Sequence, residues 1–224
     1  MRNFTVIDAP QRSPAWFAAR AGRLTGSVAG EIAATLKSGG EPAGRRDLRT
    51  RLALERICGR SFEDDYQNGD MKRGIELEPA ALRAYEVAAG NMVQFTGFLA
   101  HTQFPMGCSL DGQINDFEGI VELKAPRPAT HLKYLRAGTL PAEHRFQIIH
   151  NLYITGAQWA DFGSYAPDFP EPLRLFLVRV ERDEAELANY EKKALAFLAD
   201  VDRECEAIAT LTDVDARLKE IVNA

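Results

Sequence analysis

The sequence has few cysteines, no long hydrophobic run and none of the common nucleotide-binding or hydrolase motifs. Its three cysteines, Cys58, Cys108 and Cys205, are scattered, so we expect reduced thiols and no zinc or iron–sulfur site. The sequence has no run of about 18 apolar residues that would predict a membrane helix. Residues 1–16 lack the apolar core of a signal peptide. The absence of P-loop, GxSxG and GxGxxG patterns argues against NTPase, serine hydrolase and dinucleotide-binding functions. These absences together predict a cytoplasmic protein without a membrane partner.

The charge of the chain is unevenly distributed. The net charge is −5, and the 224 residues are expected to form a single domain over residues 1–224. Residues 44–60 carry six arginines against two acids, whereas residues 181–206 carry nine acids against four bases. Such runs of charged residues usually form solvent-exposed faces of helices. A basic patch on an acidic protein is also compatible with phosphate binding, and the sequence leaves both interpretations open.

The hydrophobic patterns predict an α/β fold with a mixed central β-sheet flanked by helices and a long C-terminal helix. Helical spacing and capping signals, such as Ser13-Pro14 and Gly90, support this order of elements. The tetrapeptide NDFE at 115–118 is expected to form a hairpin turn. Helices are predicted at 13–21, 25–36, 46–57, 72–89, 128–136, 141–155 and 183–209, and strands within 91–101, 104–114, 119–126, 158–166 and 173–181.

Three charged residues interrupt segments that should form buried neighbouring strands. Asp111 follows Cys-Ser-Leu, and Glu122 and Lys124 lie in GIVELKAP. Alternate residues of a strand share a face, so Glu122 and Lys124 point the same way, and the hairpin brings Asp111 near Glu122. Two carboxylates at close range repel. We therefore expect compensation by Lys124 and by a divalent cation such as Mg²⁺, which prefers oxygen ligands. A salt-bridged hairpin edge without a metal is the plainer alternative.

Four segments, in this order, resemble a family of nucleases. SLDG followed by ELKAP is similar to the D…ExK core of the restriction-endonuclease-like PD-(D/E)XK nucleases. WFAARAGRLTGS (16–27), RGIELEPAALRAYE (73–86) and HRFQIIHNLYITG (144–156) resemble segments of the phage lambda exonuclease and YqaJ-type viral recombinase family. The resemblance implies a restriction-endonuclease-like core and phosphodiester hydrolysis in DNA. Leu110 stands where the family often has proline, from which we expect altered strand geometry without loss of activity.

The resemblance implies a metal centre on the hairpin. Asp111, Glu122 and the backbone carbonyl of Leu123 would hold Mg²⁺, for which Mn²⁺ could substitute. The metal would lower the pKa of a bound water and stabilise charge on the phosphate. Lys124 would orient this water or stabilise its hydroxide form.

Two helix residues would complete the catalytic group. Glu78 matches the acid of the family's helix and would complete the metal coordination, directly or through water. Gln147 matches the family's glutamine and would hold the water or a metal-bound oxygen. Taken alone, an exposed helix acid and a helix-surface glutamine are equally ordinary interpretations.

Other residues are expected to contact DNA. In the context of this resemblance, Arg20 and Ser27 are assigned to a 5′-phosphate. Their chemistry is compatible with that role, because arginine binds phosphate oxygens in a bidentate manner and a serine near a helix start adds a hydroxyl and backbone donors. Arg45 and Arg46 are expected as further phosphate contacts. Met71 is interpreted as a wedge between terminal bases. The ordinary alternatives are a surface arginine, an N-cap serine and a core methionine.

The resemblance implies a Mg²⁺-dependent 5′→3′ exonuclease on double-stranded DNA ends that leaves 3′ single-stranded tails for recombination. It also implies a ring-shaped homotrimer, a phage or prophage origin, and a single-strand annealing protein as partner, for which the acidic segment 181–206 is one candidate surface. Two alternatives stay open. One is an endonuclease or repair nuclease of the same fold, and the other is a non-catalytic DNA-binding relative, which the intact Asp111, Glu122 and Lys124 argue against.

Overall fold

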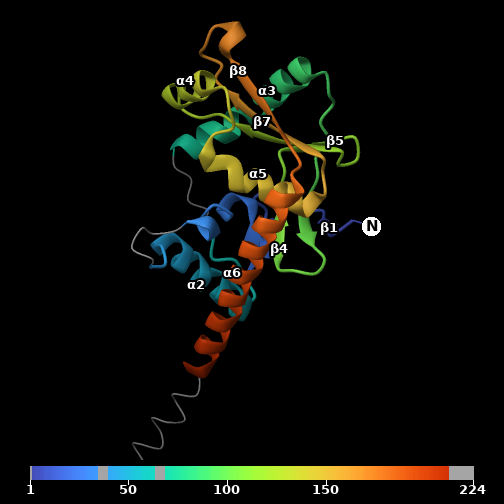
Figure 1. Ribbon diagram of the computed structural model, residues 1–224. Helices are drawn as coiled ribbons and strands as arrows, with labels where there is room; N and C mark the ends of the chain where they lie inside the picture. The colour runs from blue at the N-terminus through green and yellow to red at the C-terminus, as the bar shows by residue number, and fades with distance from the viewer. Residues whose placement is uncertain (1, 35–39, 64–68, 212–224) are drawn as a thin grey trace, which may run out of the picture.

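The chain folds into two four-stranded mixed sheets with helices packed around them (Figure 1). A computed structural model describes residues 2–34, 40–63 and 69–211, apart from the side chains of residues 70 and 71. The mixed α/β class is confirmed, although the strands are divided between two sheets. The first sheet has the order β1 (Phe4–Ile7), β3 (Phe98–His101), β4 (Met106–Cys108) and β2 (Leu24–Thr25), with β2 and β4 parallel; the second has the order β5 (Gly112–Ile114), β6 (Gly119–Lys124), β7 (Trp159–Tyr165) and β8 (Leu175–Glu181), with β6 and β7 parallel.

One helix, α5, contacts strands of both sheets and lies at the centre of Figure 1. Its inner side is fully buried at Ile148 and Leu152, which belong to the main hydrophobic core together with Tyr190 and Phe197 of the C-terminal helix. None of the helices in the described part of the chain is both long and apolar enough to cross a membrane. The helices are α1 (Pro14–Arg20), α2 (Ala43–Cys58), α3 (Gly69–Ala89), α4 (Pro128–Ala137), α5 (Ala142–Thr155) and α6 (Glu184–Leu211), with short 3₁₀ turns at Gly26–Val28, Glu31–Ala33 and Glu171–Leu173.

The local signals explain most helix ends. The Ser13 hydroxyl accepts a hydrogen bond from the Trp16 amide at 3.2 Å, so it caps α1 as expected. Asp183 caps α6 by accepting from the amides of Ala185 and Glu186. The helix α5 ends at Gly156, whose φ of 74° suits a residue without a side chain. The sequence around these helix ends thus accounts for where the elements begin and stop.

Some predicted elements were wrong. The segment expected as a helix over 25–36 forms β2 and two 3₁₀ turns, and its end lies outside the described residues. Gly26 and Gly30 weaken helix formation there, and the observed bonds join residues three apart, as in Ala29 N–H to Gly26 O. The strand β1 was not predicted. Residues 91–97 contribute only a bridge to the second sheet.

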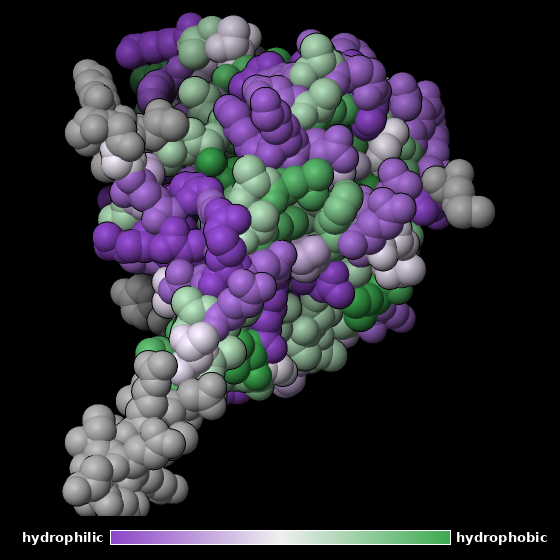
Figure 2. All heavy atoms as spheres, turned by 60° about the horizontal axis from the view of Figure 1, so that its bottom comes forward, coloured by the Kyte–Doolittle hydropathy of each residue, from purple (hydrophilic) through white to green (hydrophobic). Residues whose placement is uncertain are grey.

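The two charged segments pair with each other. The helices α2 and α6 lie side by side (Figure 1), and acids of α6 accept hydrogen bonds from arginines of α2. Figure 2, which brings the bottom of Figure 1 forward, shows hydrophilic residues over much of this end of the molecule. The basic run is therefore largely neutralised within the fold. The pairs are Arg45 with Asp200, Arg49 with Glu204 at 3.1 Å, and Arg56 with Asp202 at 2.6 Å.

Candidate active site

The β5–β6 hairpin brings the two predicted acids together. Gly112 pairs with Val121, so Asp111, one residue further, lies opposite Glu122. The Leu123 amide donates to Asp111 Oδ2 at 2.6 Å, which holds this carboxylate against the neighbouring strand. Residues 115–117 of the turn all have positive φ, which closes the hairpin where NDFE predicted it. The expected proximity of the two acids is confirmed.

Glu122 is almost fully enclosed, with 3 % of its side chain exposed. Lys124 forms an ion pair with its Oε1, and Gln147 donates to the same oxygen at 2.6 Å. Asn151 donates to Oε2 at 3.2 Å. The structure thus brings Lys124 and Gln147, two of the predicted catalytic residues, onto one carboxylate.

Burial and like charge shape the electrostatics of the hairpin. Burial raises the pKa of Glu122 to about 7; Lys124 opposes this rise and Asp111 adds to it. Burial also raises the pKa of Asp111, against Lys124 and the Leu123 amide. For Lys124, burial lowers the pKa, but Glu122 and Asp111 outweigh it and the pKa is raised, so the ammonium form persists. One lysine does not fully offset two buried carboxylates, and a further cation would.

A cleft of about 470 Å³ opens beside this hairpin. Glu78 of α3 lines it together with Asp111 and Lys124, so the structure brings the predicted helix acid to the same site. Burial and the charge of Asp111 raise the pKa of Glu78, while Arg12 and Lys124 lower it. Among the residues lining the cleft are Gln11, Arg12, Ile75, Glu78, Asp111, Leu123, Lys124, Tyr134 and His144.

The donor set of the site fits a hard divalent cation that keeps part of its water shell. In the part of the chain that is described, no three histidine, cysteine or acidic side chains lie close enough to form a complete metal cage. Asp111 and Glu122 nevertheless supply two facing carboxylates whose charge is incompletely offset. Mg²⁺ is commonly bound by one or two carboxylates, with water and substrate phosphate completing its octahedron. The role of the Leu123 carbonyl as a ligand stays a prediction.

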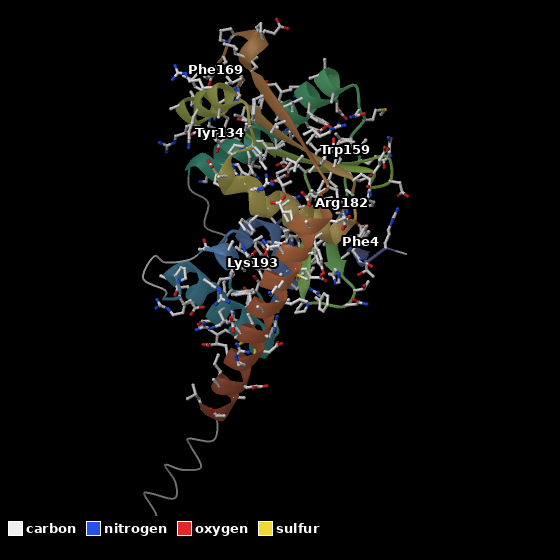
Figure 3. The ribbon with its side chains drawn as sticks, in the orientation of Figure 1. Phe4, Tyr134, Trp159, Phe169, Arg182 and Lys193 are labelled. Atoms are coloured by element: carbon white, nitrogen blue, oxygen red, sulfur yellow. The ribbon has the colours of Figure 1, made fainter. Side chains whose placement is uncertain are left out.

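Sequence reasoning missed several residues of the site. Asn151 is 1 % exposed, and its Oδ1 has no hydrogen-bond partner among the described residues. It lies one helical turn after Gln147, so the i, i+4 spacing in QIIHN was an available signal. Tyr134 and His144 line the far wall of the cleft, and Figure 3 labels Tyr134 on α4. Burial and Lys124 lower the pKa of His144 to about 4, so this imidazole is neutral at pH 7.

The close approach at Gly26 joins the site to the predicted phosphate-binding segment. A Cβ added to Gly26 would lie 2.5 Å from Asn151 Oδ1 and 3.5 Å from Cγ of Gln147. Ser27 is the next residue, and Asn151 in turn contacts Glu122. A single side chain therefore separates the Arg20–Ser27 segment from the buried carboxylate.

Arg20 and Ser27 lie together, as the sequence predicted. Arg20 Nη2 lies 3.4 Å from both Ser27 Oγ and Thr25 Oγ1. The guanidinium stacks over the Trp16 ring at 4.1 Å, and it donates two hydrogen bonds to Glu63, a partner that the sequence did not reveal. The Trp16 ring thus supports Arg20.

The remaining predicted DNA contacts lie elsewhere. Arg45 pairs with Glu41 and Asp200 at the α2–α6 interface, so its contacts do not support a role in phosphate binding. Arg46 is exposed and lies 3.5 Å from Asp47, and its role stays a prediction. The side chain of Met71 lies outside the described residues, which leaves the wedge untested. Nearby Ile75 lines the cleft.

Comparisons with known proteins identify the family to which the fold and sequence are similar. Residues 15–158 match the model of the YqaJ-like viral recombinase domain. Two crystal structures of the alkaline exonuclease LHK-Exo from Laribacter hongkongensis are 32% and 33% identical, with TM-scores of 0.80 and 0.79; each match covers 92% of this chain and 100% of LHK-Exo, and one of the structures contains dAMP. A phage-related exonuclease from Haemophilus somnus 129PT, 15% identical with a TM-score of 0.62 over 85% of this chain and 96% of its own, shares the fold. No curated protein matches the chain significantly.

Proposed function

Because the chain belongs to the family of YqaJ-like viral recombinase domains, we propose that it is a metal-dependent 5′→3′ exodeoxyribonuclease acting on double-stranded DNA ends. The observation that carries the proposal is that Asp111 and Lys124 line one cleft, while Lys124 and Gln147 both bind the buried carboxylate of Glu122 on the neighbouring strand. A salt-bridged hairpin edge would not require a glutamine and an asparagine from a distant helix to hold the buried acid.

Asp111 and Glu122 would hold the metal, with the Leu123 carbonyl and Glu78 as further ligands, the latter directly or through water. Mg²⁺ is the proposed ion and Mn²⁺ would replace it, since both prefer oxygen ligands. When bound, the ion would lower the pKa of a water and stabilise negative charge on the phosphate.

The side chains around the metal ligands have separate tasks. Lys124 keeps its positive charge beside Glu122 and would hold the attacking water or its hydroxide. Gln147 already donates to Glu122, so its amide would keep the carboxylate in position and offer its oxygen to the water. The neutral His144 and Tyr134 close the far side of the cleft without adding charge.

Arg20 and Ser27 would bind the 5′-phosphate of a DNA end. Arg20 is 8 % exposed and fixed by the Trp16 ring, so its donors are positioned before DNA arrives. LHK-Exo, over 30% identical, has been crystallised with dAMP, a nucleotide with a phosphate of the kind that such an exonuclease would release. We propose that the 3′ tails serve recombination through a single-strand annealing protein, and that the active form is a homotrimer.

The test is digestion of linear duplex DNA with Mg²⁺, in which one strand has a 5′-phosphate and the other a 5′-hydroxyl, beside closed circular DNA. Loss of the 5′-phosphorylated strand first, an intact circle and no digestion in EDTA are expected. The Lys124→Ala variant should lose at least about 100-fold in rate, whereas Lys133→Ala, on the exposed side of α4, serves as the matched control.

Cutting of the circle would instead support an endonuclease of the same fold. DNA binding without cutting in Mg²⁺ or Mn²⁺ would support a non-catalytic relative. Either result would overturn the exonuclease proposal while leaving the family membership intact.

A further inference from the structure

Arg20, which we assign to the 5′-phosphate, already forms an ion pair with the carboxylate of Glu63. Arg20 Nε donates to Glu63 Oε2 at 2.9 Å and Nη2 donates to Oε1 at 2.8 Å, a bidentate pair. Glu63 precedes α3, and 16 % of its side chain is exposed against 8 % for Arg20. Such a sheltered pair is not an incidental surface contact.

Glu63 binds the edge of Arg20 that a phosphate would use. The same Nη2 that donates to Glu63 lies 3.4 Å from the Ser27 hydroxyl. A phosphate held between Arg20 and Ser27 would therefore meet the Glu63 carboxylate. Arg20 cannot easily turn away, because it stacks on the Trp16 ring, whose Nε1 donates to Ser109 Oγ at 2.9 Å. The anion and the carboxylate must compete for one fixed guanidinium.

The charge of an anion determines whether it can displace Glu63 from Arg20. Arg51 Nη1 lies 3.6 Å from Glu63 Oε1, so two arginines face one carboxylate and the local balance is about one positive charge. An internal phosphodiester carries a single negative charge, as Glu63 does. A terminal phosphate carries about −1.5 to −2 at neutral pH and offers three strong acceptor oxygens.

We propose that Glu63 is a built-in competing anion on Arg20, which a terminal 5′-phosphate displaces and an internal phosphodiester or a hydroxyl end does not. This inference rests on the proposed function, since it takes the DNA end as the ligand of Arg20. Glu63 would keep Arg20 from holding phosphodiesters along the DNA backbone, and phosphorylated ends would bind less tightly than they would to a free Arg20.

The test is equilibrium binding of a hairpin duplex with one open end, labelled in its loop, in EDTA so that no strand is cut. The 5′-phosphorylated and 5′-hydroxyl forms are compared for the wild type, Glu63→Gln and Glu63→Ser, so that the result does not depend on one variant folding. We expect the neutral variants to bind the phosphorylated form about tenfold more tightly, since the phosphate no longer has to displace a carboxylate from Arg20, and the hydroxyl form less than about threefold more tightly. The measured preference for the phosphorylated form should therefore rise.

Glu41→Gln is the matched control, because Glu41 pairs with Arg45 and Arg49 on α2 and its loss changes the net charge equally. It should leave the preference unchanged. Weaker binding of the phosphorylated form by the Glu63 variants would overturn the proposal and make Glu63 a positioning residue for Arg20. Equal tightening of both forms would overturn it too, as general repulsion.

Digestion of duplex ends in Mg²⁺ is measured separately. Wild-type digestion of linear DNA together with an unaltered preference in the Glu63 variants would overturn the role of Glu63 alone. A wild type that neither digests ends nor distinguishes the two forms would overturn the proposed function as well.

Discussion

The contact between Gly26 and Asn151 makes a testable link between the Arg20–Ser27 segment, which we propose binds phosphate, and the buried carboxylate of Glu122. In Gly26→Ala the new Cβ would lie 2.5 Å from Asn151 Oδ1. The φ of Gly26 is not in the left-handed region, so alanine meets a steric obstacle only. Asn151 is 1 % exposed and cannot swing into solvent. Overpacking of this kind destabilises a protein by about 1–3 kcal/mol.

The opposite change removes the obstacle. Asn151→Ala deletes the hydrogen bond to Glu122, which costs about 1.5–3 kcal/mol for a charged acceptor, partly offset because the unpartnered Oδ1 is deleted too. In the double variant the Cβ added at position 26 has room, so the free energy of unfolding should equal that of Asn151→Ala within about 0.5 kcal/mol. The two changes should therefore be coupled by about 1–3 kcal/mol.

Urea denaturation of the wild type, both single variants and the double variant gives the four free energies of unfolding of this double-mutant cycle. Additive losses would show that the Gly26 backbone and the Asn151 amide do not meet, and the reasoning would be refuted. Duplex digestion by the same four proteins gives a second readout. Gly26→Ala alone should slow digestion, because a displaced Asn151 no longer holds Glu122.

The charged and titratable groups give three further predictions. Glu122→Gln should abolish digestion yet raise the free energy of unfolding at pH 8 by about 1 kcal/mol. Burial raises the pKa of the Glu122 carboxyl to about 7, so the ionised form is disfavoured in the fold and a neutral amide is not. A lower free energy of unfolding in urea would contradict this prediction. Burial lowers the pKa of His150 from 6.5 to about 4, so the unfolded state binds the extra proton between these values and stability falls by about 3 kcal/mol as pH drops from 6.5 to 4. In His150→Phe this part of the slope should vanish, and parallel wild-type and variant curves would exclude it. Arg45→Ala should lower the melting temperature and Arg46→Ala should not, since only Arg45 of these two joins α2 to α6; equal effects would argue against the helix pairing.

The charge pairing of α2 and α6 changes the meaning of the most conspicuous charge pattern in the chain. Considered separately, residues 44–60 suggested a surface for phosphate and residues 181–206 a surface for a protein partner. In the fold, three arginines of the first segment are bound by acids of the second. Other basic residues lie at the cleft, which Arg12 and Lys124 line, and beside Ser27, where Arg20 lies.

The hairpin and most of the helices could be predicted from the amino-acid sequence alone. The alternation around Glu122 and Lys124, the NDFE turn and the spacing of α5 follow from local periods of two and 3.6 residues, which are written in consecutive residues. The helix predicted over 25–36 was wrong because the prediction gave more weight to the apolar spacing than to the two glycines. The strand β1 was missed because a short edge strand has little pattern of its own.

Contacts between side chains of distant segments emerged only from the packing of the fold. The pairing of Arg20 with Glu63, the contact of Asn151 with Gly26 and the pairing of Arg45 with Asp200 join residues that no local period relates. Such contacts depend on how helices and sheets pack, and burial then sets the competition between charges, as it does for the raised pKa of Glu122. The sequence thus indicated which residue types form the site. Packing determined which of them contact the Glu122 carboxylate, which contact the Arg20 guanidinium and which line the cleft.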